Sequence, residues 1–75
     1  MRRYRDVHGD SGVVAYDPGP DFIKVRFKHG ETYVYNYEST GRFQVERMKV
    51  LAVSGEGLSA FISKFVKENY ARRET

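Results

Sequence analysis

The chain has 75 residues, with thirteen Lys and Arg against ten Asp and Glu, so its formal net charge is +3. This length corresponds to one domain, near the lower limit for independent folding. The sequence has no cysteine, which excludes disulfides and thiolate metal sites and fits a reducing compartment. It has neither an apolar run of ~18 residues that would span a membrane nor the apolar segment of a signal peptide. We therefore expect a small cytoplasmic protein with no membrane association.

The first ten residues differ in pattern from the rest of the chain. Residues 1–10 show no hydrophobic periodicity, and we predict that they form a mobile arm. Residues 11–75 are then the single domain. Its first strand is expected from Ser11 to Asp17, and a Pro-Gly-Pro sequence after this strand predicts a turn.

Alternation of apolar and polar residues predicts two further strands, at residues 22–28 and 31–37. In the first of them, one face carries apolar side chains and the other carries the cations Lys24, Arg26 and Lys28. Three consecutive strands with short connections are typical of an antiparallel meander.

The hairpin made by these two strands has two possible registers. A two-residue loop at His29 and Gly30 places Tyr33 and Tyr35 on the outer face, beside the cations. A three-residue loop that ends at Gly30 shifts the partner strand by one residue and turns both tyrosines into the core. Each buried ring contributes roughly 1.5–3 kcal/mol, which a domain of this size needs, so we predict the second register. The cations face outward in either case.

The periodicity becomes helical at Arg42, and Ser39 or Thr40 is expected to cap the helix that begins there. The glycines after Ser54 end this helix. Its buried face is predicted to consist of Val45, Met48, Leu51 and Ala52, widened by Phe43 and Val50. A second amphipathic helix follows, and its apolar face is predicted to consist of Leu58, Phe61, Ile62, Phe65, Val66 and Tyr70.

The predicted order of elements is therefore β-β-β-α-α. The most economical packing places both helices on one face of the sheet. The fold class is α+β, with a three-stranded antiparallel meander followed by two helices.

The segment from Ser11 to Phe65 resembles the KTSC domain, named after the C-terminus of some lysyl-tRNA synthetases. The resemblance rests on a strand end, a glycine turn, a Tyr-x-Tyr pair and a helical pattern, at Phe27, Gly30, Tyr33, Tyr35, Ala52, Ser54, Gly55, Leu58, Ser59 and Ile62. The chain departs from the family at Ser59, where Asn is usual, and at Ser63, where a cation is common. The resemblance implies a small bacterial domain and suggests RNA binding.

Catalysis is not expected from this sequence. The two histidines are His8, in the predicted arm, and His29, in a tight turn. A general base needs a positioned partner, which neither segment supplies. No group of His, Asp and Glu has the spacing of metal ligands. We therefore expect neither an enzyme nor a bound cofactor.

Binding of RNA is the leading functional hypothesis. Cations on one strand face would follow a phosphate backbone, and outward-facing aromatic rings would stack on bases. The candidate residues are Lys24, Arg26, Lys28, Tyr33, Tyr35 and Arg42. The same charges are also typical of a solvated strand face that discourages aggregation.

The alternative is a protein-interaction or homodimerisation module with no nucleic-acid ligand. Val14, Tyr16 and Val34 are expected to leave apolar patches on the open face of the sheet. The third strand, at the sheet edge, would also be able to pair with a second copy across a two-fold axis.

Overall fold

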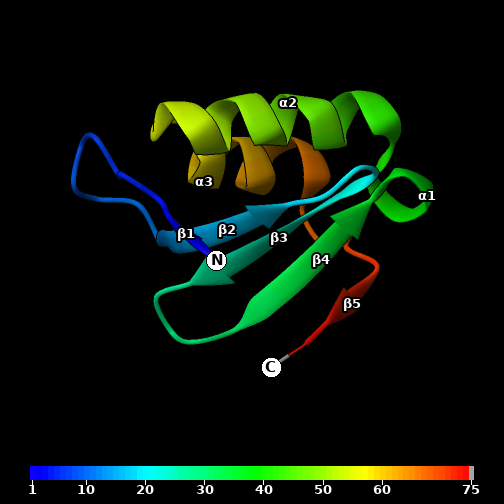
Figure 1. Cartoon of the computed structure of the whole chain (residues 1–75), viewed down its shortest axis with the longest axis horizontal. Coiled ribbons are helices and arrows are strands. Elements are labelled where there is room, and N and C mark those ends of the chain that lie inside the picture. The colour runs from blue at the N-terminus through cyan, green and yellow to red at the C-terminus, as the bar shows by residue number, and fades with distance from the viewer. Residues whose placement is uncertain (75) are drawn as a thin grey trace.

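The computed structural model shows an α+β domain, in which helices cover one face of an antiparallel sheet (Figure 1). The structure describes residues 1–74. Five strands lie side by side in chain order: β1 (Arg2–Arg3), β2 (Val13–Pro18), β3 (Phe22–Phe27), β4 (Thr32–Asn36) and β5 (Arg72–Arg73). The predicted α+β class and central meander are confirmed, but the sheet has five strands and not three.

The two additional strands come from the two ends of the chain. β1 pairs with β2, and β5 pairs with β4. Beyond β1, Tyr4 is buried in the core, and the backbone N–H of Val7 donates to the carbonyl of Gly55 at 2.8 Å. These contacts correct the prediction of a mobile arm over residues 1–10, because this segment packs against both the sheet and the helical layer.

The β3–β4 hairpin has the register that was predicted. Its loop holds three residues and ends at Gly30, whose φ of +97° is readily adopted only without a Cβ. The N–H of Phe27 donates to the carbonyl of Glu31 at 2.8 Å across the base of the loop. Tyr33 lies opposite Val25 and Tyr35 lies opposite Ile23, so both tyrosines are on the core face.

A short helix that was not predicted, α1 (Tyr37–Thr40), joins β4 to the helical layer. Its N-cap is Asn36, whose side-chain oxygen accepts from the N–H of Ser39 at 2.8 Å. The hydroxyl of Ser39 in turn accepts from the N–H of Asn36 at 3.3 Å, which completes a capping box. The expectation that Ser39 or Thr40 caps the following helix is therefore wrong.

The long helix, α2 (Arg42–Ser54), begins and ends where the sequence indicates. Val45, Met48 and Ala52 are buried in the core, as predicted. Phe43 and Val50 do not widen this face, since they point outward with 80% and 58% of their surface exposed. The core below α2 is already filled by side chains of β3 and β4 and of the neighbouring helix.

The last helical segment is shorter than predicted and changes type along its length. It begins as α3 (Leu58–Phe61) and continues as a π-helix, η1 (Ile62–Val66). The wider turn buries Ile62 and Val66 but leaves Phe65 58% exposed. The predicted helix to Tyr70 is therefore wrong at its end. The chain turns at Lys67, and the ring of Tyr70 lies 4.5 Å from that of Tyr33.

Candidate nucleic-acid interface

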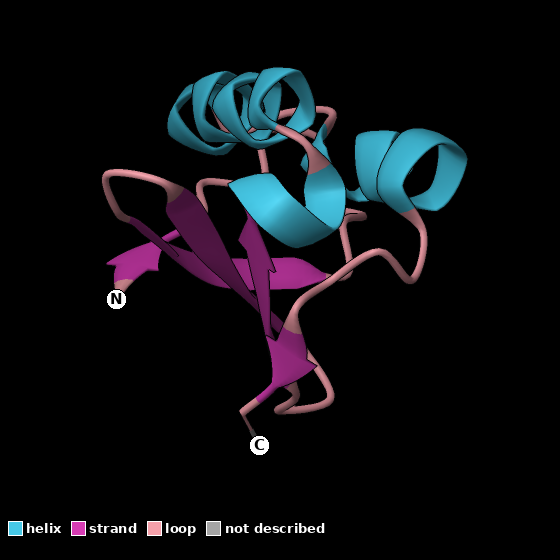
Figure 2. Cartoon of the chain, turned by 90° about the vertical axis from the view of Figure 1, so that its right-hand side faces the viewer, coloured by secondary structure: helices cyan, strands magenta, loops and turns pink. Residues whose placement is uncertain are grey.

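One face of the sheet carries no helix, as the side view shows (Figure 2). Residues paired across antiparallel strands point to the same face. Arg3 pairs with Ala15, and Ala15 pairs with Arg26. Lys24 pairs with Val34, and Val34 pairs with Arg72. The register thus gathers cations from β1, β3 and β5 on this surface, which we call the open face: Arg3, Lys24, Arg26 and Arg72.

Two carboxylates accompany these cations within or beside the strands, and a third, Asp21, lines a hollow of the same face. Asp17 pairs with Lys24 across β2 and β3. Glu74 follows β5, and its N–H donates to the carbonyl of Thr32 at 2.8 Å. The open face therefore carries more positive than negative charge.

The six residues that the sequence proposed for this site are not brought together. Lys24 and Arg26 lie on the open face, as predicted. Lys28 lies in the hairpin loop, since β3 ends at Phe27. Arg42 begins α2 in the helical layer, with its guanidinium carbon 5.8 Å from the ring centre of Tyr37. Arg42 therefore does not extend the basic stripe.

The two tyrosines lie on the opposite, helix-covered face. Tyr35 is only 2% exposed, and burial raises the pKa of its hydroxyl. Tyr33 is half-buried between the rings of Phe27 and Tyr70, at centroid distances of 5.8 and 4.5 Å. Neither ring is available to stack on a base from the open face.

Arg3 and Arg72 also lie on the open face, although neither is among the six candidate residues. Both lie in Arg-Arg pairs near the ends of the chain, and neither segment shows the apolar alternation that predicts a strand. The concentration of arginine at the two ends was the only available signal. Their position on the sheet depends on backbone pairing with distant strands, which no local pattern encodes.

The cations of the open face differ in whether a carboxylate pairs with them. The carboxylate of Glu74 lies 3.3 Å from the ammonium of Lys24 and 3.3 Å from the guanidinium of Arg72. Hydrogen bonding from Lys24 is the main reason that the pKa of Glu74 is lowered. Arg26 is exposed and donates from Nε to the hydroxyl of Thr32 at 3.2 Å, with no carboxylate partner among residues 1–74.

The open face has little exposed apolar surface. Thr32 and Val34 are buried even though no helix covers them. The long side chains paired with them across β3 and β5 cover them with their aliphatic stems. Tyr16 is in the core, so of the predicted apolar patches only Val14 is exposed. The predicted edge strand, β4, is paired with β5 and offers no free edge.

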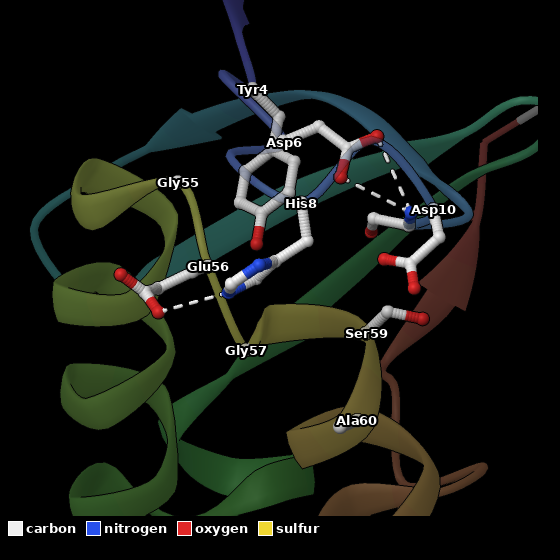
Figure 3. Close-up of a pocket in the computed structure, with 10 residues that line it drawn as sticks. Tyr4, Asp6, His8, Asp10, Gly55, Glu56, Gly57, Ser59 and Ala60 are labelled. Atoms are coloured by element: carbon white, nitrogen blue, oxygen red, sulfur yellow. Dashed lines mark hydrogen bonds and ion pairs between the residues drawn. The ribbon is translucent and has the colours of Figure 1, made fainter.

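A separate pocket of about 360 Å³ lies between the N-terminal segment and the α2–α3 turn (Figure 3). Its polar side chains include His8, whose Nε2 lies 3.3 Å from the carboxylate of Glu56. The carboxylate of Asp6 accepts from the N–H of Ser11 at 3.1 Å, and the hydroxyl of Tyr4 accepts from the N–H of Leu58. Within the described part of the chain, no three His, Asp or Glu side chains are grouped so that they could hold a metal ion.

Comparisons of the chain with protein-family models, with curated proteins and with solved structures found no match. The resemblance to the KTSC domain therefore stays a prediction from the sequence. Among the described residues, no helix has the length and apolar character needed to cross a membrane. The functional argument rests on the geometry of the open face.

Proposed function

We propose that this chain is a cytoplasmic, non-catalytic module that binds single-stranded RNA through the open face of its sheet. The observation that carries the proposal is the convergence of four cations from three strands on a surface that no helix covers: Arg3, Lys24, Arg26 and Arg72. The resemblance to KTSC domains, which itself suggests RNA binding, supports the same class of ligand.

The spacing of the cations favours a polymer over a small anion. Neighbouring strands lie about 4.8 Å apart. Arg3 and Arg26 are separated by β2, and Lys24 and Arg72 are separated by β4. The backbones of each pair are therefore about 10 Å apart, twice the distance between neighbouring strands, although the charged groups of Lys24 and Arg72 meet at Glu74. Charges distributed in this way contact several phosphates along a strand, which makes binding depend on salt.

Replacing Arg26 tests this proposal, because Arg26 is exposed and has no carboxylate partner among the described residues. We expect Arg26→Ala to weaken binding of a labelled single-stranded RNA and to lower the slope of log K against log salt by about 0.7. Fluorescence anisotropy over a salt series measures both quantities. Lys64→Ala removes the same charge from the exposed surface of η1 and is the matched control.

Three outcomes of this titration decide the proposal. A lower slope for Arg26→Ala with an unchanged slope for Lys64→Ala supports it. Equal effects of the two variants would show that only net charge matters, and would contradict a site on the open face. The absence of detectable association at low salt would also contradict it.

The outer surface of α2 favours a second candidate, self-association. Phe43, Val50 and Val53 are 80%, 58% and 57% exposed and lie on the side of α2 that faces away from the core. If two copies of α2 pair antiparallel about the midpoint between Glu46 and Arg47, Phe43 of one copy lies opposite Val50 of the other. Glu46 then lies opposite Arg47, so apolar and charged positions are both self-complementary.

Sedimentation velocity over a range of protein concentrations tests this candidate. We expect a monomer–dimer equilibrium that Phe43→Ser shifts toward the monomer, because it removes the largest exposed ring of the surface. Phe65→Ser is the control, since Phe65 is also exposed but lies on η1. A wild-type chain that stays monomeric at the highest concentration, or equal effects of the two variants, would rule out pairing through α2.

A further inference from the structure

A hollow of about 220 Å³ lies on the open face, where β3 begins and β4 ends. It is lined by an aromatic ring, two cations and three other side chains: Phe22, Lys24, Arg72, Asp21, Val34 and Asn36. This volume is below the 300–1,000 Å³ typical of pockets for drug-sized ligands. The hollow therefore has room for one planar ring and not for an extended ligand.

Phe22 is the aromatic side chain that the open face presents to this hollow. It pairs with Asn36 across β3 and β4, in the same alternation that places Lys24 and Val34 on the open face. The ring lies directly against Gly19, since a Cβ added at Gly19 would be 2.1 Å from Cε2 of Phe22. The N–H of Gly19 also donates to the carbonyl of Phe22 at 2.9 Å. This tight turn holds the half-buried ring in place before any ligand arrives.

The two cations that line the hollow are paired with the same carboxylate. The carboxylate of Glu74 contacts both Lys24 and Arg72 at 3.3 Å, which keeps the two positive groups close to one another. An anion that reaches this position gains two charged donors but competes with Glu74. The carboxylate of Asp21 repels a phosphate from its own part of the hollow. The lining therefore combines two donors for an anion with one ring for an uncharged group.

From this arrangement we propose that the hollow binds one nucleotide of the RNA strand. The base stacks on Phe22, and its phosphate lies between Lys24 and Arg72. This inference rests on the proposed function and deepens it, because it identifies the aromatic contact that Tyr33 and Tyr35 do not supply. Base–aromatic stacking accepts every base, so the hollow selects single-stranded nucleic acid without selecting its sequence.

Phe22→Leu tests the stacking contact, since it keeps apolar volume and removes the ring. The probe is a fluorescein-labelled oligouridylate of about 12 nucleotides, within the site sizes of small single-strand-binding folds. We expect the Kd to rise about tenfold, with an unchanged salt slope because no charge is lost. Phe65→Leu on η1 is the matched control and leaves the Kd unchanged.

An abasic version of the same oligonucleotide provides a second test that uses only the wild-type protein. It keeps every phosphate and lacks every base. We expect it to bind the wild type about tenfold more weakly than the oligouridylate does, and to bind Phe22→Leu with little further loss. Equal affinity of the wild type for the two oligonucleotides would overturn the inference.

The outcomes separate this inference from the proposed function. If Arg26→Ala weakens binding and Phe22→Leu does not, the open face binds RNA but the hollow does not hold a base. If Arg26→Ala behaves like Lys64→Ala, the proposed function itself fails. Glu74→Gln adds a signed test, because loss of the competing carboxylate should tighten binding several-fold. An unchanged or weaker affinity of Glu74→Gln would contradict a phosphate between Lys24 and Arg72.

Discussion

At the scale of single residues, the position of Tyr35 decides what the hairpin can do. The ring is almost fully buried and makes an edge contact with Tyr70 at a centroid distance of 6.2 Å. Its packing against the core explains why a small domain uses an aromatic residue in a strand whose other face bears polar groups. The same packing removes Tyr35 from any role in base stacking.

Truncation of this side chain should therefore be costly. We expect Tyr35→Ala to lower the free energy of unfolding by about 3–5 kcal/mol, as for other large buried rings. Thermal or chemical denaturation measures this loss. A Tyr35→Ala variant that unfolds like the wild type would mean that the ring faces solvent and that the register is wrong.

Tyr35→Phe is the control, and it also tests the raised pKa. At neutral pH it should be nearly as stable as the wild type, because it keeps the buried ring and removes only the hydroxyl. Burial raises the folded-state pKa above the ordinary value of 10.0. The part of the folding stability that depends on protonation of the Tyr35 hydroxyl is therefore complete below pH 10.0. It is lost as pH rises toward the folded-state pKa. The wild type should therefore lose more stability above about pH 10 than Tyr35→Phe does.

At the scale of elements, the N-terminal segment is attached to the domain at the turn between α2 and α3. Gly55 ends α2 with a φ of +79°, and a Cβ placed there would lie 2.8 Å from the Cβ of Arg5. The side chain of Arg5 also donates to the carbonyl of Ser54 at 3.0 Å. Gly55 thus combines a left-handed conformation with a close approach of two segments.

We expect Gly55→Ala to destabilise the domain more than Gly9→Ala does. Gly9 has a similar φ of +76°, but nothing lies within 4 Å of an added Cβ. Gly9→Ala should therefore cost only the strain of the left-handed conformation, about 1–2 kcal/mol. Gly55→Ala should cost the same strain and, in addition, the free energy needed to displace Arg5. Urea denaturation measures both, and an equal loss would contradict packing of the N-terminal segment on this turn.

The elements that the sequence predicted are those with a local pattern. Alternation located β3 and β4, and a helical period located α2, because in each case one face is buried continuously. β1 and β5 consist of exposed arginines, and their pairing partners are far away in sequence. The π-helix also lay beyond local prediction, since its apolar residues fit an ordinary helical period equally well.

The same distinction applies to the candidate site. Lys24 and Arg26 were predictable because they alternate with buried residues of β3. Arg3, Arg72 and Glu74 reach the open face only through long-range pairing. Phe22 begins the predicted strand, but its role depends on the close contact with Gly19, which alternation does not predict. Alternation within a strand was enough to predict which of its residues face outward. It does not predict which residues reach the open face through pairing with distant strands.

At the scale of the whole molecule, the two layers present different surfaces. The open face of the sheet is basic, and the outer side of α2 exposes apolar side chains. The outer side of α2 faces away from the sheet, so the body of the helical layer separates these two surfaces (Figure 1). Binding of RNA to one layer and self-association through the other are therefore geometrically compatible.

The most direct test of the central claim is a map of the RNA contact surface by NMR. The ¹⁵N-labelled protein is titrated with single-stranded RNA at low salt, and amide shifts are followed residue by residue. We expect the largest changes in β3, β4 and β5, at positions such as Phe22, Arg26 and Arg72, and small changes in α2. Changes confined to α2 or to the pocket beside His8, or no changes at all, would contradict RNA binding by the open face.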